Sequence, residues 1–176
     1  MVNKSGWCAT AALLLLCCQP SLAVKNMRLY GALVAEPCVI LPGDETVVLD
    51  FDTVNNKYLY MNTRTRGQAF ELRLAQCDLS MGEKVRVTFS GDESVALPGL
   101  LALSATSVAS GIAIGMETPL GEPLPINLPS KAQRLIGGAN ILTIHAYVKG
   151  EPEALAHRTI ERGTFNAQAT ISLEYE

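Results

Sequence analysis

One alternating stretch decides the fold, Phe70-Glu71-Leu72-Arg73-Leu74-Ala75-Gln76-Cys77. Its apolar residues recur at every second position, and the side chains of a β-strand point alternately to opposite faces. The stretch therefore predicts a strand with one buried face and one exposed face. Cys77 is out of phase with the apolar residues before it, so we expect a β-bulge or a strand end at this cysteine.

The same period of two recurs on both sides of this strand, in residues 47–51, 85–89, 112–116, 142–148 and 165–175. Each of these runs predicts a half-buried strand, and Gly, Pro, Asp and Asn residues mark turns between them. A helical pattern is possible only at residues 153–157, which are short enough to be a turn. Short strands at this spacing predict an all-β sandwich with an immunoglobulin-like plan. The runs supply roughly six strands, whereas such a sandwich uses about seven, which suggests that one strand is missing or supplied from elsewhere.

The first 23 residues have the organisation of a secretory signal peptide. Lys4 supplies the positive charge, an apolar run covers residues 9–18, and Pro20 precedes a small-x-small stretch that ends at Ala23. Cleavage after Ala23 leaves 153 of the 176 residues, enough for one domain. A transmembrane anchor is the weaker alternative, because about 20 apolar residues are needed to cross a bilayer.

Composition and motifs exclude several classes of function. The mature chain has 13 basic and 17 acidic residues, which gives no basic footprint for nucleic acid and no polybasic anchor for a membrane surface. His145 and His157 fall on an outward strand position and in a charged loop, and we expect both to be solvated. Asp50 and Asp52 are explained by exposure at a strand end. Because no nucleophile elbow, phosphate loop or metal-ligand spacing is present, the sequence predicts no catalysis, cofactor or metal.

Cys38 and Cys77 are the only cysteines after the leader. In an oxidising compartment such a pair predicts a disulfide, and closing a loop of about 40 residues should stabilise the fold by roughly 4 kcal/mol. Ahead of Cys38, residues 24–35 form an extended-looking segment. Periodicity alone favours an ordinary first strand for this segment, although a glycine inside a strand, Gly31, is a weakness unless two backbones approach closely there.

Several further features occur together and in a fixed order. After the signal peptide come Leu29-x-Gly31-x-Leu33, Pro37-Cys38, the strand ending in Cys77, residues 85–89 followed by Gly91, Gly111-Ile112-Ala113-Ile114, and an ending in which Gly163 is fourteenth from the end and Tyr175 next to last. This set resembles the pilin subunits of the bacterial chaperone-usher pathway. The spacing and residues 152–155 look most like the minor tip-adaptor subunits of P-type pili.

The resemblance implies an incomplete immunoglobulin-like sandwich, whose missing seventh strand leaves an apolar groove. It divides the chain into a signal peptide at 1–23, a donor-strand extension at 24–35 and a pilin domain at 36–176. A periplasmic pilus chaperone would fill the groove first, and at the outer-membrane usher the extension of a neighbouring pilin subunit would replace it. The donor residues would be Met27, Leu29, Gly31, Leu33 and Ala35. The strand that flanks the groove and binds the chaperone would contain Gly163, Phe165, Ala167, Ala169, Ile171, Leu173 and Tyr175.

We therefore expect a structural subunit, a minor pilin or adaptor, that polymerises by donor-strand exchange. It would be secreted through the periplasm and assembled into a surface fimbria that serves cell adhesion, with no nucleic-acid partner and no direct membrane insertion. The alternative is a secreted immunoglobulin-like binding module or an adhesin domain. A tip adhesin of this family resembles a lectin domain joined to a pilin domain, and 153 residues leave no room for both.

Overall fold

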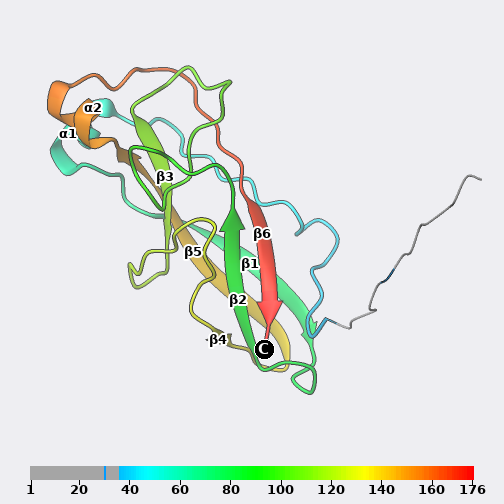
Figure 1. The fold of residues 1–176 in the computed structure, drawn as a ribbon. Coiled ribbons are helices and arrows are strands. Elements are labelled where there is room, and N and C mark those ends of the chain that lie inside the picture. The colour runs from blue at the N-terminus through cyan, green and yellow to red at the C-terminus, as the bar shows by residue number, and fades with distance from the viewer. Residues whose placement is uncertain (1–29, 31–35) are drawn as a thin grey trace, which may run out of the picture. The chain divides into compact units, whose positions relative to one another are not determined.

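The structure is a computed structural model that describes residue 30 and residues 36–176. The predicted leader and the donor residues Met27, Leu29, Gly31, Leu33 and Ala35 lie outside the described residues. The elements follow one another as α1 (Asn56–Asn62), β1 (Gln68–Cys77), β2 (Lys84–Ser90), β3 (Ile112–Glu117), β4 (Gln133–Arg134), β5 (Gly138–Gly150), α2 (Pro152–His157) and β6 (Thr170–Tyr175) (Figure 1).

The strands form two three-stranded sheets. In one, β5 lies between β1 and β3, and in the other, β2 lies between β4 and β6. Every ladder in both sheets is antiparallel. Alternating residues of β1, β2, β3 and β5 meet in one apolar core between the sheets. Phe70 of β1 and Phe89 of β2 cross this core edge to face, with ring centroids 6.3 Å apart, which is a favourable geometry for aromatic pairs. The predicted all-β sandwich is confirmed.

β3 is buried on both faces, so the predicted half-buried strand is wrong for residues 112–116. The ring of Tyr147 covers its outer face, and it lies so close to Gly115 that a Cβ at this position would collide with the ring. The guanidinium of Arg64 lies 4.0 Å from the centroid of that ring. Arg64 also donates two 2.8 Å hydrogen bonds to the Glu117 carboxylate, which is almost fully buried. This hydrogen bonding raises the pKa of Arg64.

Two short helices close one end of the sandwich. α2 covers the predicted turn at residues 153–157, and Pro152 occupies its first turn, where proline is tolerated. No periodic pattern in the sequence predicts α1, although Asn55 is a good capping residue and its side chain accepts a hydrogen bond from the Lys57 N–H. Leu59 of α1 is 1% exposed and belongs to a second apolar cluster with residues of β3, β5 and α2.

Two predicted strands are absent in whole or in part. Residues 47–51 form no strand, and the predicted strand at residues 165–175 begins only at Thr170. Both segments keep the expected alternation, since Val47, Leu49, Phe165 and Ala167 are half-buried and pack against the core. A strand requires hydrogen bonds to a neighbouring strand as well as alternation. These two segments therefore mark where a neighbour is lacking among the described residues.

Candidate functional site

An open groove runs along the edge of the sandwich between two segments. We call residues 44–54 the N-terminal bank and residues 163–173 the C-terminal bank. The groove consists of two adjoining cavities of about 720 and 430 Å³, which share Val47, Ala167, Ala169 and Ile171 as lining residues. Core side chains form its floor: Phe70, Leu72, Leu74, Phe89, Leu101, Ile114, Met116 and Ala146. The floor is thus the side of the hydrophobic core that faces the groove, and all of its residues are buried except the half-buried Phe70.

β6 directs half of its backbone groups toward this groove. In an antiparallel ladder, successive residues point their N–H and C=O groups alternately to the strands on either side. The backbone groups of Glu176 and Lys84 exchange hydrogen bonds of 2.9 and 3.1 Å. Because Glu176 points its backbone groups toward β2, the even-numbered residues of β6 do so as well. Ile171 and Leu173 therefore point their backbone groups away from β2 and toward the groove.

The same alternation continues toward the start of the C-terminal bank. The C=O groups of Thr164 and Asn166 accept hydrogen bonds from Val108 and Ser104, both 2.8 Å long. The backbone groups of Phe165, Ala167 and Ala169 have no hydrogen-bond partner among residues 30 and 36–176. The inward side chains and the unpaired backbone groups thus belong to the same odd-numbered residues, which are those that the sequence predicts for the groove strand.

The N-terminal bank is also almost free of backbone pairing. The Asp52 N–H donates to the Asp50 carboxylate, and the Asp50 C=O accepts from the Gln68 side chain, both at 2.8 Å. Within the described part of the chain, residues 45–54 make no other backbone hydrogen bond. Half-buried backbone groups normally have hydrogen-bond partners. Since most of these groups lack one among the described residues, both banks can accept the hydrogen bonds of an added strand.

Gly163 and an aromatic pair mark the helix end of the groove. A Cβ at Gly163 would lie 2.6 Å from Val108 Cγ1 and 3.0 Å from the Ala109 nitrogen, so there is no room for a side chain. Phe51 of the N-terminal bank and Phe165 of the C-terminal bank have ring centroids 6.2 Å apart. The two banks therefore touch at this end through their aromatic rings.

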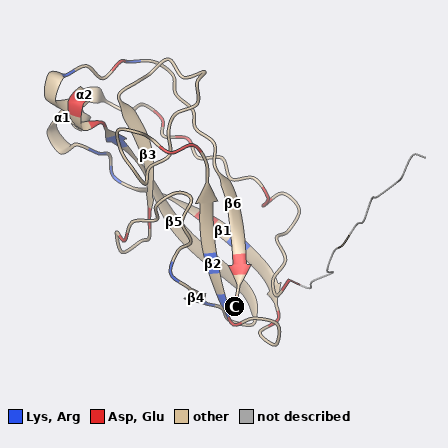
Figure 2. Cartoon of the chain, in the orientation of Figure 1, with Lys and Arg blue, Asp and Glu red and all other residues tan. Residues whose placement is uncertain are grey.

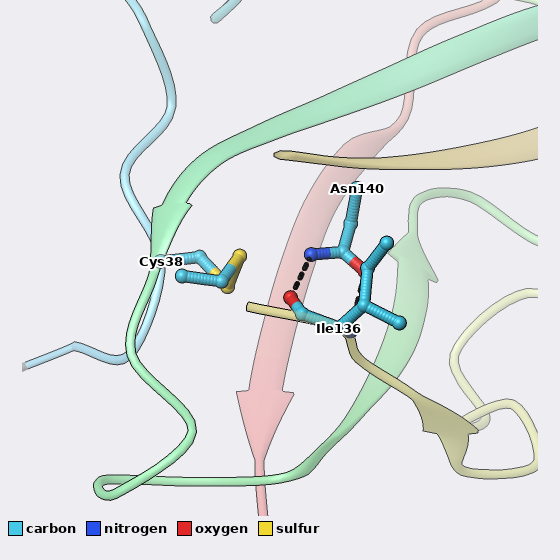
Figure 3. Close-up of a disulfide and its surroundings, with 4 residues drawn as sticks. Cys38, Ile136 and Asn140 are labelled. Atoms are coloured by element: carbon cyan, nitrogen blue, oxygen red, sulfur yellow. Dashed lines mark hydrogen bonds between the residues drawn. A yellow bond between two sulfur atoms is a disulfide. The ribbon is translucent and has the colours of Figure 1, made fainter. Parts of the chain in front are cut away.

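The disulfide lies toward the opposite end of the sandwich. Cys38 and Cys77 are joined, as predicted, and Figure 3 shows the bridge beside Asn140, whose side-chain amide exchanges two hydrogen bonds with the backbone of Ile136. The register of β1 shifts between Leu74 and Cys77, which confirms the predicted irregularity. Just past Cys38, the chain is therefore fastened to β1, and from there it leads into the N-terminal bank.

The last two residues hold the end of the C-terminal strand in place. Burial raises the pKa of the Tyr175 phenol, and the nearby charge of Glu36 adds to this effect. The carboxylate of Glu176 pairs with Arg86 of β2, and this hydrogen bond lowers the pKa of Glu176. The penultimate tyrosine and the terminal glutamate thus anchor β6 on β2 and leave its other edge facing the groove.

The remaining candidates from the sequence lie apart from one another. His157 is exposed at the end of α2, whereas His145 is half-buried, because Gly67 passes directly over it. Asp50 and Asp52 are exposed on the N-terminal bank, but they lie in a turn-like backbone with a positive φ of 50° at Asp52, so the predicted strand end is wrong. Among the residues that the structure places, no group of three or more acidic, histidine or cysteine side chains could hold a metal ion.

An antiparallel two-sheet sandwich with an open groove along its last strand is an immunoglobulin-like domain that lacks one strand. The sequence profile of the family described as fimbrial protein matches residues 27–176. The putative minor fimbrial subunit PmfF of Proteus mirabilis (strain HI4320) is 30% identical over 153 residues, which cover 86% of this chain and 84% of that protein. The fimbrial adapter PapK of Escherichia coli is 28% identical over 157 residues, which cover 86% and 88% of the two chains.

A chain of a solved chaperone-usher pilus has the same fold. It superposes with a TM-score of 0.69 at 21% identity and covers 88% of this chain and 97% of that chain. The chain belongs to the fimbrial protein family, whose members named above are subunits of fimbriae. The predicted resemblance and the predicted incomplete sandwich are thereby confirmed. In the described part of the chain, every helix is too short or too polar to cross a membrane.

Proposed function

We propose that this pilin accepts a donated β-strand in its groove and donates residues 24–35 to the groove of a neighbouring subunit. The observation that carries the proposal is a row of backbone groups at Phe165, Ala167 and Ala169 that are unpaired in the part of the chain that the structure places and lie directly above an apolar floor. A strand added to a sheet edge gains main-chain hydrogen bonds, and its alternate side chains enter pockets. Met27, Leu29, Leu33 and Ala35 are the apolar side chains that would do so.

The direction of the donated strand follows from the sheet that it extends. Every ladder in this domain is antiparallel, and antiparallel pairing is slightly more stable per residue than parallel pairing. We place Ala35 opposite Gly163 in a donor strand that runs antiparallel to β6. Because each step of one residue along the donor is matched by one residue along the bank, Gly31 then lies opposite Ala167 and Lys25 opposite Leu173. Ala167 lines both cavities, so Gly31 would cross the groove where the cavities meet.

The path to the fimbria completes the proposal. Residues 1–23 direct export and are removed, a periplasmic chaperone occupies the groove until assembly, and the outer-membrane usher is the place of exchange. The similarity to a putative minor subunit and to a fimbrial adapter supports the role of a minor or adaptor pilin. The assembled fimbria would then serve cell adhesion.

Refolding of the mature chain tests this function without a chaperone. The chain is diluted from urea alone or with an excess of a synthetic peptide of residues 24–35, and the products are separated by gel filtration. We expect aggregation without the peptide and a monomeric complex with it. A matched peptide with Leu29→Ser and Leu33→Ser should not rescue folding, because it cannot fill the pockets.

A second peptide tests the role of Gly31. Gly31→Leu should rescue folding much more slowly, because a side chain at a close backbone approach typically costs about 1 to 3 kcal/mol. A stable monomer that forms without any peptide and binds none would contradict the proposed function.

A further inference from the structure

Acidic and basic residues are segregated along this chain. All 17 acidic residues lie at or after Glu36, whereas residues 24–35 contain two basic residues, Lys25 and Arg28, and no acidic residue. The proposed donor segment is therefore cationic, and residues 36–176, with 11 of the 14 basic residues, are anionic. Donor and acceptor would be parts of different molecules, so this segregation bears on which subunits can pair.

The acidic residues are also distributed unevenly around the groove. The N-terminal bank contains Asp44, Glu45, Asp50 and Asp52 and no basic residue, and the C-terminal bank has no charged residue. Figure 2 colours the acidic residues of this bank red. Arg73 is the one basic residue among those that line the two cavities, and its charge is matched by Glu71 at 3.1 Å. The groove thus has an apolar floor and one acidic rim.

The acidic rim has two parts, and only one lies near the proposed position of the donor cations. Asp44 and Glu45 line the smaller cavity together with Thr170 and Leu173. In the antiparallel arrangement, Lys25 lies opposite Leu173 and Arg28 opposite Thr170. Arg28 is out of phase with Met27 and Leu29, so its side chain would point out of the groove, where the carboxylate of Glu45 is exposed. Asp50 and Asp52 line the larger cavity with Gly163, at the other end of the donor.

We propose that the groove selects a donor strand whose N-terminal half is cationic, and that residues 24–35 of a second copy of this chain are such a strand. This inference rests on the proposed function, because it assigns the chemistry of the strand that the groove accepts. Exposed charge pairs contribute little to affinity, but complementary charge raises association rates and suppresses partners of the wrong charge. The selection should therefore be kinetic and sensitive to salt.

Association rates of labelled peptides with the refolding mature chain measure this selection. The parent peptide, a neutral Lys25→Gln/Arg28→Gln peptide and a reversed Lys25→Glu/Arg28→Glu peptide are compared by fluorescence anisotropy. Near 20 mM salt we expect a roughly three- to tenfold loss of rate for the neutral peptide and a larger loss for the reversed one. Near 1 M salt, where the screening length is about 3 Å, the three rates should converge.

Matched variants of the acceptor locate the selecting charges. Asp44→Asn/Glu45→Gln should slow the parent peptide as much as neutralising the peptide does, and should remove the difference between the parent and neutral peptides. Glu122→Gln/Glu153→Gln is the control, because it makes the same change of charge at two exposed residues that line neither cavity of the groove. Asp50→Asn/Asp52→Asn should have a smaller effect than Asp44→Asn/Glu45→Gln.

The outcomes separate this inference from the proposed function. If no peptide binds, the groove does not accept this strand, and both fail. If all three peptides bind at equal rates near 20 mM salt, strand donation stands and charge selection is wrong. If Asp50→Asn/Asp52→Asn has the larger effect, or if the control pair slows binding equally, the assigned contact with Asp44 and Glu45 is wrong.

Discussion

β5 and β6 show complete and incomplete strand pairing within one domain. β5 is paired with β1 along one edge and with β3 along the other, and its core residues Leu142 and Ile144 are at most 6% exposed. Within residues 36–176, β6 is paired only with β2, and its inward residues Ile171 and Leu173 remain half-buried. The two strands have the same alternating pattern, so the difference in burial comes from their neighbours. The closed side of the domain is complete, whereas the open side requires one more strand.

The largest expected effect concerns the disulfide, which fastens the chain leading into the open side to the closed side. Cys38→Ser/Cys77→Ser removes a bridge between residues 39 positions apart, and the added freedom of the unfolded chain should lower the free energy of unfolding by roughly 4 kcal/mol. Urea unfolding of the peptide-complemented subunit measures this loss. A loss below about 1 kcal/mol would show that the bridge does not constrain the chain in this way.

A pair of truncations compares the two strands directly. Ile144→Ala on β5 should lower the free energy of unfolding by about 3 kcal/mol, because it leaves a cavity in a closed core. Ile171→Ala on β6 should cost less when the groove is empty and more when the donor peptide fills it. Urea unfolding of both variants, each at a low and at a saturating peptide concentration, gives the four losses of free energy that are compared. The comparison fails if the cost of Ile171→Ala is independent of the peptide.

Gly163 tests how closely the open side is packed at its helix end. Gly163→Ala should cost about 1 to 3 kcal/mol by overpacking, since the new Cβ would lie 2.6 Å from Val108 Cγ1. Val108→Gly should restore part of this loss, because it removes both Cγ1 and Cβ of Val108, which would lie 2.6 and 2.7 Å from the new Cβ, whereas the Ala109 nitrogen at 3.0 Å remains. A double-mutant cycle in thermal unfolding gives the coupling. Additive effects would mean that the close approach is not the reason for the glycine.

The smallest expected effect is the pH dependence of the pair that anchors β6 on β2. Because the pKa of Glu176 is lowered by Arg86, the pair stabilises the folded state above the usual pKa of a glutamate, about 4.3. That contribution is lost as the pH falls through the lowered value. The difference in urea midpoint between the parent and Glu176→Gln should therefore be small at pH 7 and vanish in strong acid. A difference that does not depend on pH would contradict the role of the charge.

Period-two patterns predicted the closed side better than the open side. They located β1, β2 and β5, and the phase of Cys77 predicted the irregularity at the end of β1. The same patterns at residues 47–51 and 165–169 predicted strands that the structure does not contain. Alternation reports only which side chains are buried, whereas strand formation also depends on a hydrogen-bonding partner that a local pattern cannot reveal.

Burial on both faces of β3 was likewise invisible in the sequence. Arg64 and Tyr147 are far from β3 along the chain, and the fold brings them together over the face of β3 that contains Gly115 and Glu117. α1 had a recognisable capping residue in Asn55, but it is too short to show a helical period. Such short elements are stabilised mainly by tertiary packing, which here buries Leu59.

By itself, the sequence determined the all-β class, the single disulfide, and the set of inward-facing residues from Phe165 to Tyr175, because each follows from local alternation or from the number of cysteines. Only the tertiary structure decided that Phe165, Ala167 and Ala169 keep a backbone edge above an apolar floor that is unpaired among the described residues, and that Asp44 and Glu45 lie beside it. The physical reason is that a strand edge is open or closed according to what lies next to it, and that neighbour is set by contacts between residues distant in the chain.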